Sequence, residues 1–159
     1  MLRKTALALL VPATLLLPAC GQDNLTIPDV PRAVLEVTVD PNPVTGVQNP
    51  LTGSVSAAYR ITITERAGLG GEVQFVSSQI YDPETGLRVA LNYFDGADLV
   101  VFVGSKRIEP GGTLVVPQTS DYFLPDFRVP AQLAVNVQMK DDRENLINQS
   151  VLVRINAPE

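Results

Sequence analysis

The chain has 159 residues, enough for one folded domain, and 45% of them are hydrophobic against 18% charged. This balance excludes a wholly disordered chain, because enough apolar surface is present to form a core. A net charge of −5 excludes the basic surface that nucleic-acid binding requires, so we expect no nucleic-acid partner.

Residues 1–20 have the order of charges and apolar residues that is typical of a secretory signal. Arg3 and Lys4 form a short positive segment, and residues 5–17 form an apolar run that is too short to cross a bilayer as a helix. Cys20, the one cysteine of the chain, follows closely after this run. The pattern predicts export. An ordinary cleaved signal with an incidental cysteine and an uncleaved helical anchor are the alternatives.

Leu17-Pro18-Ala19-Cys20 resembles the lipobox of bacterial lipoproteins. The resemblance implies that residues 1–19 are a signal peptide, and that Cys20 is lipidated with covalent diacylglycerol and acyl chains. No other cofactor is expected. Several chains on one residue anchor a protein without a basic patch, because each buried CH₂ contributes about 0.8 kcal/mol. Gly21, where an aspartate would favour the inner membrane, implies an outer-membrane location facing the periplasm.

Residues 20–32 are predicted to be the lipidated cysteine and a tether, since polar residues, Gly and Pro dominate there without periodicity. Residues 33–159 are predicted to be the folded domain, in which apolar and polar side chains alternate as in strands with one buried face. We expect strands at residues 33–40, 55–63, 72–81, 87–94, 99–103, 113–116, 131–140 and 150–156. A slip of the alternation within residues 73–76 predicts a bulge.

Turn-forming residues separate these segments, at residues 40–43, 68–71, 82–86, 95–96, 110–112 and 141–145. No stretch shows the apolar period of a capped helix. About eight short strands predict an all-β fold, a single antiparallel β-sandwich. In pattern alone it resembles the immunoglobulin-like and fibronectin-like domains of bacterial envelope proteins. A closed barrel is the alternative.

The absence of His excludes a Ser-His-Asp triad, a Cys-His pair and an imidazole metal site, so we expect no enzyme. An enzyme with paired carboxylates ranks last among the alternatives. Asp141, Asp142 and Glu144 form the densest acidic cluster, and calcium prefers such oxygen ligands. Their spacing is not that of an EF-hand loop, and a solvated hairpin turn is the competing interpretation.

Residues 119–130 bring three aromatic side chains close together between two predicted strands: Tyr122, Phe123 and Phe127. If they are exposed, these rings form a surface for a partner. The alternative is a connection between the sheets whose aromatic side chains fill one end of the core.

Together these patterns predict a lipid-anchored protein of the bacterial cell envelope that acts as a non-catalytic binding or scaffolding module. The alternative is a structural accessory subunit of an envelope or transport complex, which would require an unidentified protein partner. The membrane, reached through the lipid on Cys20, is the partner that the sequence specifies.

Overall fold

The computed structural model describes residues 31–158. The predicted signal peptide, Cys20 and most of the predicted tether lie outside these residues. The described elements are β1 (Leu35–Asp40), β2 (Val44–Gln48), β3 (Val55–Glu65), β4 (Gly71–Tyr81), β5 (Arg88–Asp95), α1 (Gly96–Val103), β6 (Arg107–Ile108), β7 (Thr113–Tyr122), β8 (Ala131–Asp141) and β9 (Leu146–Asn156). Within residues 31–158, no helix has the length and apolar character needed to cross a membrane.

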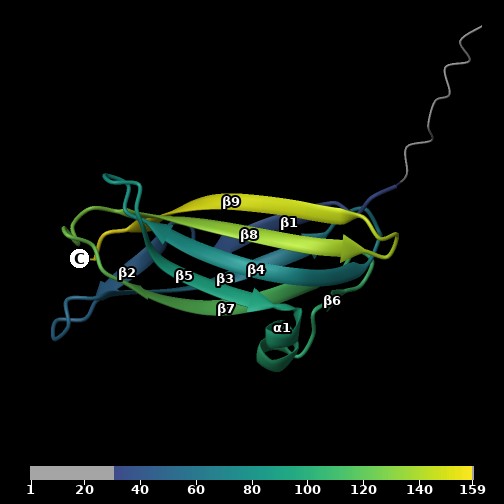
Figure 1. The fold of residues 1–159 in the computed structure, drawn as a ribbon, viewed down its shortest axis with the longest axis horizontal. Coiled ribbons are helices and arrows are strands. Elements are labelled where there is room, and N and C mark those ends of the chain that lie inside the picture. The colour runs from purple at the N-terminus through teal and green to yellow at the C-terminus, as the bar shows by residue number, and fades with distance from the viewer. Residues whose placement is uncertain (1–30, 159) are drawn as a thin grey trace, which may run out of the picture. The chain divides into compact units, whose positions relative to one another are not determined.

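Two sheets pack face to face (Figure 1). In the first sheet, β1 and then β2 pair antiparallel with one edge of β3, and β7 pairs antiparallel with its other edge. The second sheet has the order β9-β8-β4-β5, antiparallel throughout, with β6 paired to the start of β4. This arrangement is an immunoglobulin-like sandwich, which confirms the predicted fold class.

The strand β2 belongs to both sheets. Its first residues, Val44 and Thr45, run parallel to β9, whereas residues 46–48 pair with β3. Gly46 lies at this crossing, where an added Cβ would come within 2.8 Å of Val55. At the opposite side of the sandwich, β5 and β7 are not paired with each other, so the sheet stays open. The alternative of a closed barrel is therefore wrong.

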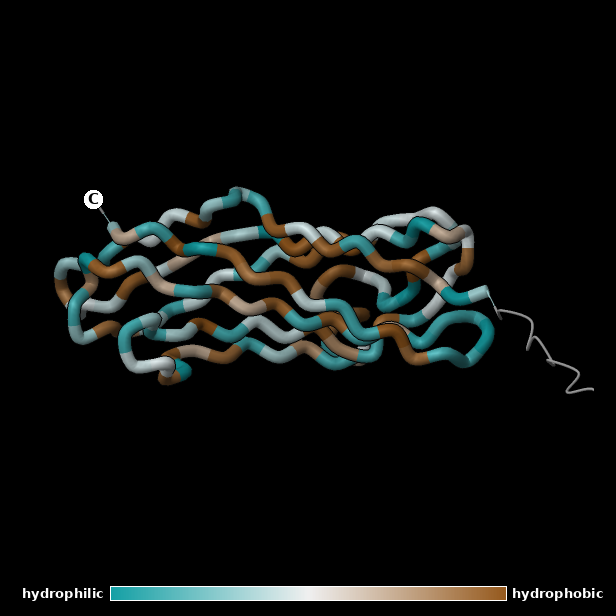
Figure 2. The backbone as a smooth tube through the Cα atoms, turned by 90° about the horizontal axis from the view of Figure 1, so that it is seen from above, coloured by the Kyte–Doolittle hydropathy of each residue, from teal (hydrophilic) through white to brown (hydrophobic). Residues whose placement is uncertain are grey.

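Alternation of apolar and polar residues builds the core. Brown apolar and teal polar positions alternate along several strands in Figure 2. The buried faces of the two sheets meet around Ile61, Ile63, Ile80 and Leu133, which are fully enclosed. The pairing of β4 with β8 shifts register between Val73 and Phe75, which confirms the predicted bulge.

The prediction of a strand at residues 99–103 is wrong, because these residues belong to α1. Leu99 is the only fully buried residue of this eight-residue helix. So short a helix with one buried position has no apolar stripe, and the run of apolar residues there looks like a strand in the sequence.

Caps at both ends define α1. Asp95 accepts hydrogen bonds from the N–H groups of Ala97 and Asp98 at 2.7 and 2.9 Å, and the Asp98 carboxylate accepts one from the N–H of Asp95. This is a capping box, which satisfies donors that the first turn of a helix leaves unpaired. Gly104 ends the helix with a φ of 83°, a left-handed conformation that suits glycine.

The strand β7 is longer than predicted. The sequence predicts a strand at residues 113–116 and a connection from residue 119, but the strand continues through Pro117 to Tyr122. Pro117 has no N–H to donate to a ladder. Proline is tolerated on an edge strand, where the missing donor is outside the ladder. The short strands β2 and β6 were also not predicted.

A buried carboxylate, that of Glu65, holds the start of the domain. It accepts hydrogen bonds at 2.7 to 3.3 Å from the backbone N–H groups of Val34, Ala67, Gly68, Leu69 and Gly111. These donors come from the segment before β1, the turn after β3 and the turn before β7. One side chain therefore fixes three segments that are far apart in the sequence.

Asp141 acts in the same way beside Glu65. Its carboxylate is buried and accepts hydrogen bonds from the backbone N–H groups of Ala33 at 3.2 Å, Arg143 at 2.9 Å and Asn145 at 2.8 Å. The contact to Ala33 joins the start of the domain to the β8–β9 turn. Ala33 and Val34 are thus held by two different buried carboxylates.

Both carboxyl groups favour their charged form. Burial alone would raise the pKa of Glu65, but the backbone N–H groups that it accepts from hold this pKa below its ordinary value. Burial also acts to raise the pKa of Asp141, and the donors of Asn145, Ala33 and Arg143 outweigh it and lower this pKa. A carboxyl with a lowered pKa stabilises the fold above its unfolded-state pKa, and this contribution is lost as the pH falls through the folded-state value.

We expect the free energy of unfolding to fall as the pH is lowered below about 4.5, where these two carboxyl groups begin to protonate in the unfolded chain while they stay charged in the folded one. Glu65→Gln should lower this free energy by about 2–4 kcal/mol at pH 7. The reason is that some of the backbone N–H groups that donate to the carboxylate would then face the NH₂ group of the amide, which cannot accept. The loss should be smaller near pH 3. Urea unfolding followed by circular dichroism measures both effects. Glu84→Gln, at an exposed position, is the control, and an equal effect of the two substitutions would contradict the role of Glu65.

Candidate binding groove

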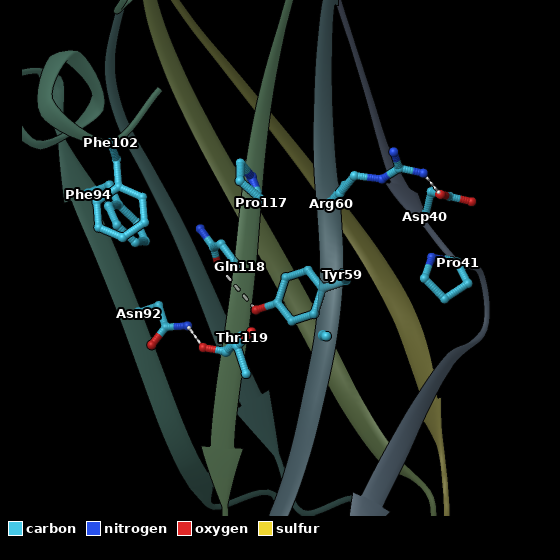
Figure 3. Close-up of a pocket in the computed structure, with 11 residues that line it drawn as sticks. Asp40, Pro41, Tyr59, Arg60, Asn92, Phe94, Phe102, Pro117, Gln118 and Thr119 are labelled. Carbon is cyan, nitrogen blue, oxygen red and sulfur yellow. Dashed lines mark hydrogen bonds and ion pairs between the residues drawn. The ribbon is translucent and has the colours of Figure 1, made fainter. Parts of the chain in front are cut away.

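A groove of about 670 Å³ runs along the side of the sandwich where β5 and β7 lie next to each other (Figure 3). We call it the β5–β7 groove. Its lining comes from the end of β1 with the residue after it, and from β3, β5, β7 and α1. The site therefore depends on both sheets, and no single segment of the sequence contains it.

Tyr59 connects the two sheets beneath the groove. From β3 its hydroxyl oxygen lies 2.8 Å from Ser120 Oγ and 3.1 Å from Gln118 Oε1, both on β7. It also lies 2.9 Å from Ser78 Oγ on β4, in the opposite sheet, and Ser78 donates to Gln118 Oε1. Burial raises the pKa of Tyr59, against the opposing effect of its hydrogen bonds, so its hydroxyl stays protonated at neutral pH.

Asn92 connects β5 to β7. Its Nδ2 donates to Ser120 Oγ at 2.8 Å. It also donates to the backbone oxygen of Thr119 at 3.2 Å, a contact that Figure 3 shows. A side chain thus bridges two strands that have no backbone ladder between them. Because Tyr59 also binds Ser120, the bridge and the core network form one connected set of hydrogen bonds that sets how the groove walls are spaced.

The two ends of the groove differ in chemistry (Figure 3). At one end, Phe94 of β5 and Phe102 of α1 pack edge to face, with ring centroids 5.1 Å apart and planes at 67°. Phe102 is 63% exposed. At the other end, Arg60 and Asp40 form an ion pair at 2.6 Å. The groove therefore has an aromatic wall and no uncompensated charge.

The acidic side chains predicted as calcium ligands line one surface pocket, but each of them is engaged by groups of the protein itself. Asp141 points inward, as described above, and Asp142 makes two contacts with the guanidinium of Arg107 at 2.9 and 3.0 Å, which lowers the pKa of Asp142. Glu144 pairs with Lys140. Within residues 31–158, no group of three acidic, Cys or His side chains is placed to hold a metal ion.

The three aromatic residues predicted as a partner surface are also separated. Tyr122 is buried at the end of β7, and its burial raises its pKa to about 12. Phe127 packs against the core, with the Arg128 guanidinium 5.9 Å from its ring centroid. Phe123 is 61% exposed. Only one of the three rings faces solvent, so they form no common aromatic surface.

Sequence reasoning missed the groove. Its aromatic wall depends on α1, which was predicted as a strand, and its amide groups come from β5 and from the unpredicted part of β7. No local motif connects Asn92, Phe102 and Gln118. A signal was present in the buried phase of β7, where Gln118 and Ser120 replace the apolar residues that a core strand normally has.

No protein-family model matches the sequence, and no curated protein sequence matches it. Among solved structures the chain is similar to a Bordetella pertussis protein assigned as ApaA, with 15% identity and a TM-score of 0.61 over 82% of this chain and 98% of that one. It is also similar to the structural-genomics target SoR45, with 15% identity and a TM-score of 0.59 over 78% of this chain and 87% of that one.

A weaker similarity is to the CARDB domain of the Pyrococcus furiosus PF1109 protein. It has 14% identity and a TM-score of 0.42 over 78% of this chain and 92% of that one, too low to establish a shared fold. At 15% identity, the similarities to the protein assigned as ApaA and to SoR45 show a fold and no ligand. The class that the structure defines is an all-β domain with an immunoglobulin-like sandwich.

We expect Tyr59→Phe to lower the free energy of unfolding by about 1–2 kcal/mol, because it removes the hydroxyl that joins the two sheets. Tyr81→Phe is the matched control, since the Tyr81 hydroxyl contacts Gln79 on its own strand and is half-buried. Urea unfolding of both variants measures the difference. Equal losses would show that the network does not hold the sheets together.

Proposed function

We propose that this protein is a non-catalytic binding module that acyl chains on Cys20 hold at a membrane of the bacterial envelope. The β5–β7 groove is the observation that carries the binding half of the proposal. It is open to solvent and combines aromatic side chains with amide groups, which is the usual composition of a site that binds small molecules.

The chemistry of the groove supports binding over catalysis. Its titratable lining residues are Asp40, Tyr59 and Arg60. Asp40 and Arg60 are paired, and the raised pKa of Tyr59 keeps its hydroxyl protonated. A general base must be free to accept a proton from a substrate, whereas Asp40 is paired with Arg60 and the Tyr59 hydroxyl stays protonated.

The anchoring half of the proposal rests on the sequence before the described residues. An apolar run precedes Cys20, and Gly21 follows it, which favours the outer membrane and its periplasmic face. Residues 20–32 reach at most about 47 Å when fully extended. The contacts of Glu65 and Asp141 with Val34 and Ala33 are suited to a tethered domain, because they hold the segment through which a tether would pull.

We expect Cys20→Ser to abolish labelling by an alkyne fatty acid in a bacterium with two membranes, and to move the protein from the membrane fraction to the soluble fraction. The physical reason is that the acyl chains alone supply the apolar surface that enters the bilayer. Labelling, membrane fractionation and the mass of the mature N-terminal peptide measure the effect.

The matched control combines Cys20→Ser with Thr52→Cys, which places a thiol in an exposed turn. Labelling should not return, because lipidation depends on the position of the cysteine after the apolar run. A wild-type protein without label, or a Cys20→Ser variant that is still labelled, would refute the anchor.

A further inference from the structure

Gln118 brings an unsatisfied polar group to the β5–β7 groove. The side chain is only 7% exposed, and its Nε2 has no hydrogen-bond partner in the described part of the chain. Its Oε1 accepts from the Tyr59 and Ser78 hydroxyl groups, which leaves Nε2 as the amide atom without a partner. Figure 3 shows the nitrogen turned away from Tyr59, on the side where Phe94 lies. A buried donor without a partner costs about 1–3 kcal/mol, which a ligand oxygen would recover.

Asn92 adds an acceptor to the lining of the groove. Because its Nδ2 donates to Thr119 and Ser120, the orientation of the amide is determined. Its Oδ1 points away from Thr119 (Figure 3). A hydroxyl group accepts and donates at once, so it suits a site that offers both an amide N–H and an amide oxygen. A carboxylate or phosphate group only accepts.

The charges of the groove favour a neutral ligand. Arg60 is the cationic side chain in the lining, and its contact with Asp40 at 2.6 Å compensates its charge. An anionic ligand would have to displace Asp40, and a cationic one would have to displace Arg60. Neither side chain offers a free charge to a ligand.

The aromatic wall offers a flat apolar face beside the amides. Phe102 is largely exposed, and its edge-to-face contact with Phe94 fixes the orientation of its ring. The C–H face of a sugar ring packs on such an aromatic face, while the hydroxyl groups at the edge of the sugar stay free to bond with amides.

An extended peptide fits the groove less well. A peptide that added a strand to β7 would need the backbone groups along its free edge. Pro117 has no N–H, and the backbone oxygen of Thr119 already accepts from Asn92. These two features block strand addition at the middle of the groove.

We propose that the β5–β7 groove binds a neutral carbohydrate, whose ring stacks on Phe102 and whose hydroxyl groups bond to the Gln118 and Asn92 amides. This inference rests on the proposed binding function and names its ligand class. The acyl anchor would then hold a sugar-binding domain at the membrane surface.

The test uses the full chain, purified in a detergent without sugar groups. The probes are a glycan array with neutral glucans, neutral N-acetylated oligosaccharides and acidic oligouronides, and a parallel array of neutral peptides. We expect binding to at least one neutral oligosaccharide and none to the oligouronides. Isothermal titration with the oligosaccharide that binds then gives the dissociation constant.

Phe102→Ala and Gln118→Met should each weaken that binding by about tenfold or more. Phe102 is exposed, so its loss should leave the fold intact, as circular dichroism and the melting temperature will show. Val101→Ala is the matched control on α1, because Val101 is 85% exposed and does not line the groove. This variant should bind like the wild type.

No binding to any neutral oligosaccharide, or binding that Phe102→Ala and Gln118→Met leave unchanged, would overturn the carbohydrate proposal. Binding to peptides alone that depends on Phe102 would also overturn it, but would leave the proposed binding module standing. If no probe of either array binds, the groove loses its support as a binding site, and the anchor on Cys20 is still decided by its own labelling experiment.

Discussion

The hydroxyl of Tyr59 is the contact on which the arrangement of this sandwich depends. It lies in the core, where an unpaired polar group would cost several kcal/mol, and it is satisfied only because Ser78, Gln118 and Ser120 converge on it from two sheets. The same network continues to Asn92 on β5. A polar core contact thus sets the spacing of two edges that no backbone ladder joins, and the groove follows from that spacing.

At the start of the domain, the buried polar groups are charged and not neutral. There Glu65 and Asp141 are buried as charged groups, and backbone N–H donors from several turns compensate the cost of their burial. These carboxylates accept hydrogen bonds from the chain itself. The polar groups that can still form hydrogen bonds with a ligand are therefore those of the groove. The groove itself is lined by neutral amides, and its one acid and one base are paired with each other.

Much of the strand pattern follows from local sequence, because alternation with a period of two is visible within a few residues. The bulge near Phe75 and most strands were predicted in this way. The helix α1 was not, because its eight residues carry a single buried position and its capping residues, Asp95 and Asp98, are equally common in turns. The continuation of β7 through Pro117 could not be predicted from the sequence. Proline is tolerated at the edge of a sheet, and an edge position is a property of strand pairing and not of sequence.

By itself the sequence determined the fold class and, through Cys20 and the apolar run before it, the prediction of a lipid anchor. Only the tertiary structure decided that Asp141 faces inward to Ala33, and that Tyr122 is buried whereas Phe123 is exposed. It also brought Asn92, Phe102 and Gln118 together at one groove. The physical reason is that periodicity reports which face of a strand is buried. Which strands become neighbours is set by long-range pairing between segments that carry no common local pattern.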